Sequence, residues 1–200
     1  MDADAVEIRV LGCLIEKQRT TPGVYPLSLN SLRLACNQST NRDPVVDHGD
    51  GEIRAALERL DRKRWARLAS GPGSRAAKYR HLLDEALQVD GAELSLLALL
   101  MLRGPQTPGE LKQRSECLHA FESTAHVEQR LEQLAERELV ARLERRPGQK
   151  EERWAQLLGA DAEPAAPLAL RDSGAATLEE RVAALERHVA ELKAAVAERD

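Results

Sequence analysis

The sequence has 200 residues, of which 42% are hydrophobic, 31% charged and only 2% aromatic, and its formal net charge is −4. This composition is that of a globular protein, and the shortage of aromatic residues favours small helical domains with short hairpins over one large sheet. Three scattered cysteines, an acidic start without a signal-peptide pattern and no apolar run near the roughly 20 residues that span a membrane predict a cytoplasmic protein without a membrane partner.

The first predicted helix begins after Asp4, because Asp4 and Glu7 have the spacing of a capping box. Its apolar residues recur at helical spacing, and the helix is expected to end near Gln18: Val6, Val10, Leu11, Leu14 and Ile15. Pro22 then marks a stiff connector, and Ser28 is the expected N-cap of a second helix. The apolar residues of this second helix are Leu29, Leu32 and Leu34.

A third helix is predicted after Asp50, which is the expected N-cap. Ile53, Leu57 and Leu60 form its apolar stripe. The pattern then changes to that of strands, predicted at residues 65–68 and 78–83, with a turn at the Gly-Pro-Gly sequence 71–73. Three helices followed by a β-hairpin are the elements of a winged helix-turn-helix domain.

The same order of elements is predicted a second time. Asp90 with Glu93 repeats the first cap, and Thr107-Pro108-Gly109-Glu110 begins another second helix. The third helix and the strands correspond as well: Val127, Leu131, Leu134, residues 139–143 and residues 153–158. The sequence therefore predicts a mainly α fold with short β-hairpins, consisting of two tandem winged helix-turn-helix domains at residues 1–85 and 90–159.

The last part of the chain is predicted to differ from both domains. Residues 160–176 are rich in Ala, Pro, Gly and Asp, which is typical of a flexible linker. Residues 177–200 are predicted to form an amphipathic helix resembling a coiled coil, whose seam alternates Leu and Val: Leu178, Val182, Leu185, Val189, Leu192 and Val196. This alternation favours a parallel pair, so we expect a weak homodimer; docking of the helix onto its own chain is the alternative.

A long polar segment separates the second and third helices of the first copy. It contains Asn37-Gln38 and Asn41-Arg42-Asp43-Pro44-Val45 and follows Leu29-Asn30-Ser31-Leu32 and Tyr25-Pro26-Leu27. Together these sequences resemble the YceH-like family of bacterial tandem winged-helix proteins, over roughly residues 5–160. The resemblance implies the tandem fold but no activity, because the family is uncharacterised. Ser39-Thr40 stand where the family usually has Lys-Ser, which removes a positive charge from the segment.

Candidate nucleic-acid-binding residues lie on the polar segment, the third helix and the first hairpin: Asn37, Gln38, Asn41, Arg42, Arg54, Arg62, Arg75 and Lys78. Amide and guanidinium groups contact phosphates and base edges, but those of the polar segment can equally hold the loop by bonding its backbone. On the third helix, Glu58 is four residues from both arginines and can pair with either. Basic hairpin tips contact the DNA backbone in many complexes, and they also serve simply as soluble turns.

The corresponding helix face of the second copy is acidic and suits a protein better than a phosphate: Glu128, Gln129, Glu132, Gln133 and Glu136. Cys117, His119 and His126 lack a fourth ligand and the usual spacing of a zinc site, so we expect no metal and no cofactor. No catalytic motif is present, and an enzyme is not expected. We expect DNA binding in a regulatory role through the first domain and its wing; the alternative is a protein-interaction or scaffolding module that does not bind nucleic acid.

Overall fold

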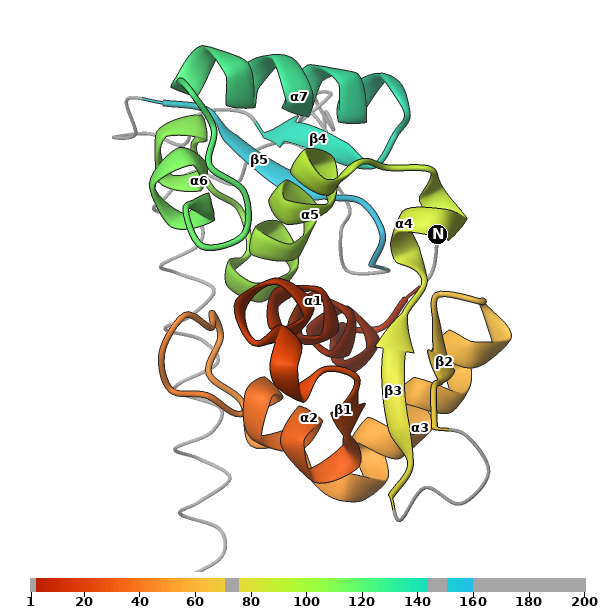
Figure 1. Cartoon of the computed structure of the whole chain (residues 1–200). Coiled ribbons are helices and arrows are strands. Elements are labelled where there is room, and N and C mark those ends of the chain that lie inside the picture. Colours follow the sequence, from red (N-terminus) through yellow and green to blue (C-terminus); the bar gives the residue numbers. More distant parts are fainter. Residues whose placement is uncertain (1–2, 71–75, 144–150, 160–200) are drawn as a thin grey trace, which may run out of the picture. The chain divides into compact units, whose positions relative to one another are not determined.

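The computed structural model describes residues 3–70, 76–143 and 151–159 (Figure 1). The first half of the described chain contains α1 (Ala5–Thr20), the 3-10 helix η1 (Pro22–Val24), β1 (Leu27–Ser28), α2 (Leu29–Cys36), α3 (Asp50–Arg62), β2 (Ala66–Leu68) and β3 (Lys78–His81). After α4 (Leu83–Leu87), the second half contains α5 (Gly91–Arg103), α6 (Pro108–Ser115), α7 (Thr124–Glu136), β4 (Val140–Leu143) and β5 (Arg153–Gln156). The described protein is therefore mainly helical, with small antiparallel sheets, and none of its described helices is long and apolar enough to cross a membrane.

Most of the predicted helix starts are confirmed by their hydrogen bonds. At α1 the Glu7 N–H donates to the Asp4 carboxylate, and the Asp4 N–H donates to the Glu7 carboxylate, both at 2.8 Å. The same reciprocal pair caps α5, and Thr107 with Glu110 caps α6. These caps satisfy backbone N–H groups that have no partner inside the helix, which is why short sequence patterns locate them well.

Several details of the sequence prediction are wrong. The N-cap of α3 is Gly49 and not Asp50, because the Glu52 carboxylate accepts the Gly49 N–H at 2.8 Å. Helix α1 continues to Thr20. Leu34 is 58% exposed and does not belong to the apolar face of α2. The return strand ends at His81, because the chain enters α4, which together with β1 was not predicted.

The two halves end their third helices in the same way. After α3 the Trp65 N–H donates to the Leu60 carbonyl at 2.9 Å, and after α7 the Leu139 N–H donates to the Leu134 carbonyl at 3.0 Å. The residue before each of these donors has a left-handed φ, of 59° and 56° respectively. This turn stops a helix without Gly or Pro and sends the chain directly into the first strand of the hairpin.

Each half has its own small sheet. In the first half the strand order is β1-β3-β2, all antiparallel, with Leu27 opposite Tyr79 and Arg67 opposite Arg80. In the second half β4 pairs with β5. An isolated antiparallel β-bridge also joins Trp154 of β5 to Gln106, which lies just before α6. Each half therefore contains the antiparallel strand pair that the sequence pattern predicts, and β1 adds a third strand to the first sheet.

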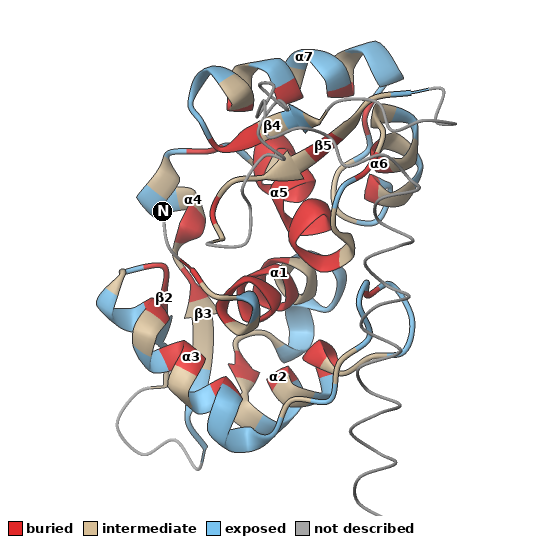
Figure 2. Ribbon diagram, turned by 180° about the vertical axis from the view of Figure 1, so that it is seen from behind, coloured by how far each residue is buried: buried red, intermediate tan, exposed pale blue. Residues whose placement is uncertain are grey.

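Helix α1 of the first half packs against helix α5 of the second half, and this pair forms the main contact between the halves (Figures 1 and 2). Every residue of 7–15 and of 92–102 is buried, so both helices are covered on all sides and not on one face alone. Contact is close at Gly12, where a Cβ atom would lie 2.8 Å from Cγ of Leu102. Helices α3 and α7 lie on opposite sides of this α1–α5 pair (Figure 1), and the exposed residues of both face outward (Figure 2).

All the described residues belong to one compact unit, which contains both halves. The predicted linker at 160–176 and the predicted helix at 177–200 lie outside the described residues. So do the six residues predicted to form the dimer seam: Leu178, Val182, Leu185, Val189, Leu192 and Val196.

The close contact at Gly12 makes a prediction about packing. We expect Gly12→Val to lower the free energy of unfolding by roughly 2 kcal/mol, because the added side chain must push Leu102 and Met101 of α5 aside. Urea unfolding followed by circular dichroism measures this loss. Gly51→Val is the matched control: a Cβ atom there meets nothing within 4 Å, so its effect should stay below about 0.5 kcal/mol. Equal losses in the two variants would contradict the packing argument.

Candidate nucleic-acid interface

Arg42, a candidate from the polar loop, lies in the interior. It is 6% exposed, and its two terminal nitrogens donate to both carboxylate oxygens of Glu16 at 3.0 and 2.6 Å. Its Nε donates to the Ala35 carbonyl at 3.0 Å. Burial alone would raise the pKa of Glu16, but the bonds from Arg42 outweigh it and lower that pKa. Arg42 is thus committed to α1 and α2, and we remove it from the nucleic-acid candidates.

The other three loop candidates also bind within the protein. Asn37 exchanges two hydrogen bonds with the backbone of His48, both at 2.9 Å. Gln38 accepts a hydrogen bond from Arg42 at 2.9 Å, and Asn41 accepts one from Arg103 of α5. These contacts are those expected if the side chains hold the loop in place, which is the second interpretation of the sequence.

Two charged residues of α1 complete this network and were not predicted. Glu16 pairs with Arg42, and Arg9 donates to the Pro44 carbonyl at 2.6 Å and to the Cys36 carbonyl at 3.3 Å. Arg9 lies within a continuous stretch of buried residues. An arginine inside an apolar helical run is a signal that could have identified it, because a buried guanidinium requires several acceptors.

The basic residues of α3 divide into two groups. Arg59 and Lys63 face α1, where Arg59 pairs with Asp4 at 2.5 Å and Lys63 with Glu7 at 2.7 Å. Arg54 and Arg62 are exposed and form no ion pair within the described residues. The pairing with Glu58 that the helical spacing allows is therefore not formed within the described residues, and both arginines keep free donors.

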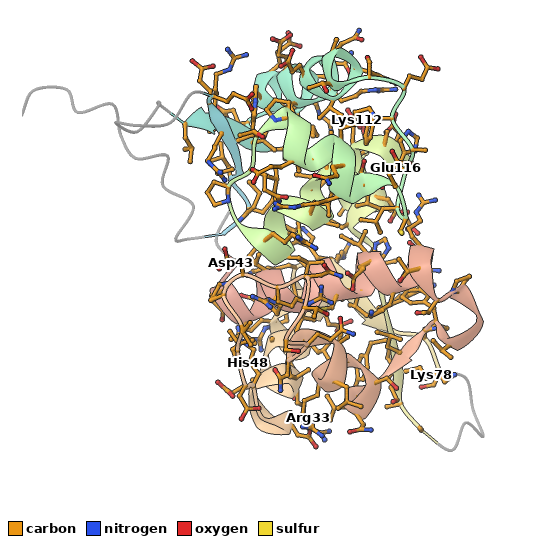
Figure 3. The ribbon with its side chains drawn as sticks, turned by 90° about the vertical axis from the view of Figure 1, so that its left-hand side faces the viewer. Arg33, Asp43, His48, Lys78, Lys112 and Glu116 are labelled. Atoms are coloured by element: carbon orange, nitrogen blue, oxygen red, sulfur yellow. The ribbon has the colours of Figure 1, made fainter. Side chains whose placement is uncertain are left out.

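A hollow of about 240 Å³ separates α3 from the sheet of the first half, and we call it the α3 groove. It is lined by residues of α3, β2 and β3: Arg54, Leu57, Glu58, Asp61, Arg67, Leu68 and Tyr79. Arg67 was not among the candidates, because its place beside Arg54 depends on how the hairpin folds over the helix. Lys78 is exposed at the start of β3 (Figure 3), whereas Arg75 lies outside the described residues.

The second half has a hollow at the corresponding place, between α7 and the hairpin, which we call the α7 groove. Its volume is about 550 Å³, and its walls are Pro108, Gly109, Thr124, Glu128, Glu132, Arg142, Glu151, Glu152 and Trp154. Arg142 lies 4.9 Å from the centre of the Trp154 ring and pairs with Glu132 at 3.3 Å and Glu152 at 3.2 Å. One arginine therefore faces four carboxylates, so the lining of this groove is net negative, whereas that of the α3 groove is balanced.

Within the described part of the chain, the side chains of Cys117, His119 and His126 do not form a metal site. The rings of His119 and His126 pack against Phe121, with centroids 4.6 and 5.6 Å away, and Cys117 is exposed. Among residues 3–70, 76–143 and 151–159, no three His, Cys, Asp or Glu side chains come together in a way that could hold a metal ion.

These features define a mainly helical protein in which two halves each combine three helices, a hairpin and a groove between the last helix and the strands. The chain belongs to the family described as "Protein of unknown function, DUF480", whose model matches residues 3–149. Its relatives are bacterial UPF0502 proteins. One from Geotalea daltonii is 53% identical over 80% of this chain and 74% of its own length. One from Azotobacter vinelandii is 48% identical over 88% of this chain and 78% of its own length. One from Geobacter sulfurreducens is 50% identical over 90% of this chain and 85% of its own length.

Proposed function

We propose that the two halves are winged helix-turn-helix domains and that the protein binds DNA through the first, in a regulatory role in the cytoplasm. The observation that carries this proposal is the division of charges on α3. Its inward cations are neutralised by Asp4 and Glu7, whereas Arg54 and Arg62 point outward without a described partner. Outward arginines on a helix followed by a basic hairpin match the way helix-turn-helix proteins place one helix in the major groove.

The α3 groove also contains two carboxylates, Glu58 and Asp61, so its charge is balanced and not strongly positive. Carboxylates repel phosphates but accept hydrogen bonds from the amino group of cytosine. We infer that Arg54, Arg62 and Arg67 contact phosphates or guanine and that Glu58 restricts which bases are accepted. Binding of this kind is modest in affinity and strongly dependent on salt.

The second candidate function is binding of a basic protein segment, with no nucleic acid involved. It is favoured by the α7 groove, where Trp154 is one of the lining residues and Arg142 is outnumbered by four glutamates: Glu128, Glu132, Glu151 and Glu152. Such a surface repels phosphate and attracts Lys or Arg side chains. The weak homodimer predicted from residues 177–200 is compatible with either candidate.

The DNA proposal makes a prediction for single charge removals. Arg54→Gln and Arg62→Gln should each weaken binding to a mixture of genomic fragments and lower the slope of log K against log salt by about 1, because each removes one phosphate contact. Fluorescence anisotropy at 50 and 200 mM KCl measures both quantities. Lys112→Gln is the control. Lys112 lies on α6 beside Glu116 (Figure 3), so this substitution also removes one positive charge but at a residue outside the α3 groove.

Two outcomes decide between the candidates. If the unmodified protein does not bind DNA even at low salt, the DNA proposal is wrong and the interaction module is preferred. If Lys112→Gln weakens DNA binding as much as Arg54→Gln does, the binding is an effect of net charge and α3 is not the interface.

A further inference from the structure

A third cavity lies where the two halves meet, away from both grooves. Its volume is about 380 Å³. One side is formed by the start of α1 and the loop before α3, with Ile8, Pro44 and Val46. The other side is formed by the end of α5 and by β5, with Met101 and Ala155. Figure 3 shows Asp43 and His48 on the loop that borders it.

The lining is mostly apolar, and the few polar groups balance in charge. Arg9 and Asp43 carry opposite charges in the described lining, and its third titratable residue, His48, lies 3.6 Å from the Glu52 carboxylate. The guanidinium of Arg9 is already bound to the Pro44 and Cys36 carbonyls. The side-chain oxygen of Gln156 accepts hydrogen bonds from the N–H groups of Leu158 and Gly159. Its side-chain NH₂ group has no partner among the described residues. The cavity therefore offers apolar walls and one spare donor.

We propose that this cavity is a binding site for an uncharged, mostly apolar small molecule with one hydrogen-bond acceptor, which the Gln156 amide receives. The cavity opens to the solvent, because Asp43, Pro44 and Pro105 of its lining are exposed, so a small molecule can enter it from solution. Its volume lies in the range of known small-molecule sites, which are apolar with a few placed polar groups. The balance of Arg9 and Asp43 favours a ligand without net charge over an anion or a cation.

Such a ligand contacts both halves at once. The loop is joined to α5 by the bond from the Asp43 N–H to the Leu102 carbonyl, at 2.9 Å, and Ala3 donates to the Leu158 carbonyl at 3.1 Å. These two bonds flank the cavity and connect the first half to the second. A molecule between them adds contacts to both halves at once, beside the buried pair of α1 and α5. This inference does not depend on whether the protein binds DNA.

The test uses the full chain and the fluorescent probe prodan, an uncharged naphthalene that carries one ketone acceptor. We expect saturable binding of one prodan per chain, with emission shifted to the blue. Ala155→Phe fills the cavity from β5, and Val46→Trp fills it from the loop; each should weaken binding at least tenfold. Ala86→Phe on the exposed surface of α4 is the matched control and should bind as the unmodified protein does. Circular dichroism verifies that each variant is folded.

A fourth variant tests the polar contact separately. Gln156→Glu keeps an oxygen that accepts the backbone N–H groups but removes the NH₂ donor, so it should weaken prodan several-fold while leaving the unfolding transition nearly unchanged. No saturable binding by the full chain would overturn the proposal. Binding that is equal in the unmodified protein, Ala155→Phe and Val46→Trp would overturn it as well, because the probe would then lie elsewhere.

Discussion

Arg42→Ala is expected to lower the free energy of unfolding by roughly 3 kcal/mol, because it leaves the largely buried carboxylate of Glu16 with Lys17, at 3.2 Å, as its remaining cationic partner. The same change removes the bond to the Ala35 carbonyl and so releases the loop from the end of α2. Urea unfolding at pH 7.5, followed by circular dichroism, measures the loss. An effect of this size would assign Arg42 to the interior of the fold and not to a nucleic-acid surface.

Arg33→Ala is the matched control, because Arg33 pairs with Asp50 at 2.8 Å on the surface (Figure 3). Exposed pairs contribute little, so this change should cost less than about 1 kcal/mol. A double-mutant cycle with Glu16→Ala then isolates the pair itself, and we expect a coupling energy above about 1 kcal/mol. A loss for Arg42→Ala as small as that for Arg33→Ala would show that the network does not hold the loop.

The second large effect is expected from pH. The His81 side chain is fully buried: its Nε2 lies 2.6 Å from the Gln18 oxygen, and its Nδ1 accepts from the Leu83 N–H at 3.4 Å. Because Nδ1 accepts, Nε2 carries the proton and the ring is neutral. Burial lowers the pKa of His81 to about 4, and the partial compensation by the Asp84 carboxylate does not reverse this.

The sign of the pH dependence follows from the lowered pKa. Above about pH 6.5 the ring is neutral in both folded and unfolded chains and has no effect. As the pH falls below that value the unfolded chain takes up a proton first, so stability decreases until the folded ring is protonated near pH 4. The full loss is about 3 kcal/mol, of which roughly 2 kcal/mol should appear between pH 7.5 and pH 5.

Urea unfolding at these two pH values measures the decrease, and His81→Gln should abolish most of it. His126→Gln is the control, since it removes a histidine beside Phe121 in the other half, and it should retain the pH dependence of the unmodified protein. If His81→Gln loses as much stability on acidification as the unmodified protein, another group is responsible.

The local parts of the fold could be predicted because local physics determines them. The capping pair of Asp4 and Glu7 and the stripe of Ile53, Leu57 and Leu60 depend on residues within one or two turns of a helix. The packing of α1 on α5 could not be derived in that way, because it joins segments about 90 residues apart. Residues 96–102 are all apolar, so a helix formed by them has apolar residues on every face. This pattern indicates from the sequence that α5 is buried on all sides.

The candidate site shows the same division. The exposure of Arg54 and Arg62 followed from helical periodicity alone. The pairing of Arg42 with Glu16 did not, because the two lie 26 positions apart and meet only after the loop has folded back on α1. The Asn, Gln and Arg residues of that loop look the same in the sequence whether they bind a phosphate or a backbone carbonyl. Only the folded surroundings distinguish the two roles.

Helices α3 and α7 lie on opposite sides of the α1–α5 pair, and this arrangement determines how many partners one chain can hold (Figure 1). A straight DNA duplex lying against α3 cannot bend around the central helices to reach α7. Under the DNA proposal, one chain would cover one site on a duplex and leave the α7 groove facing away from it. The surface on that opposite side, with its four carboxylates, would then remain accessible to a second molecule while the duplex is held.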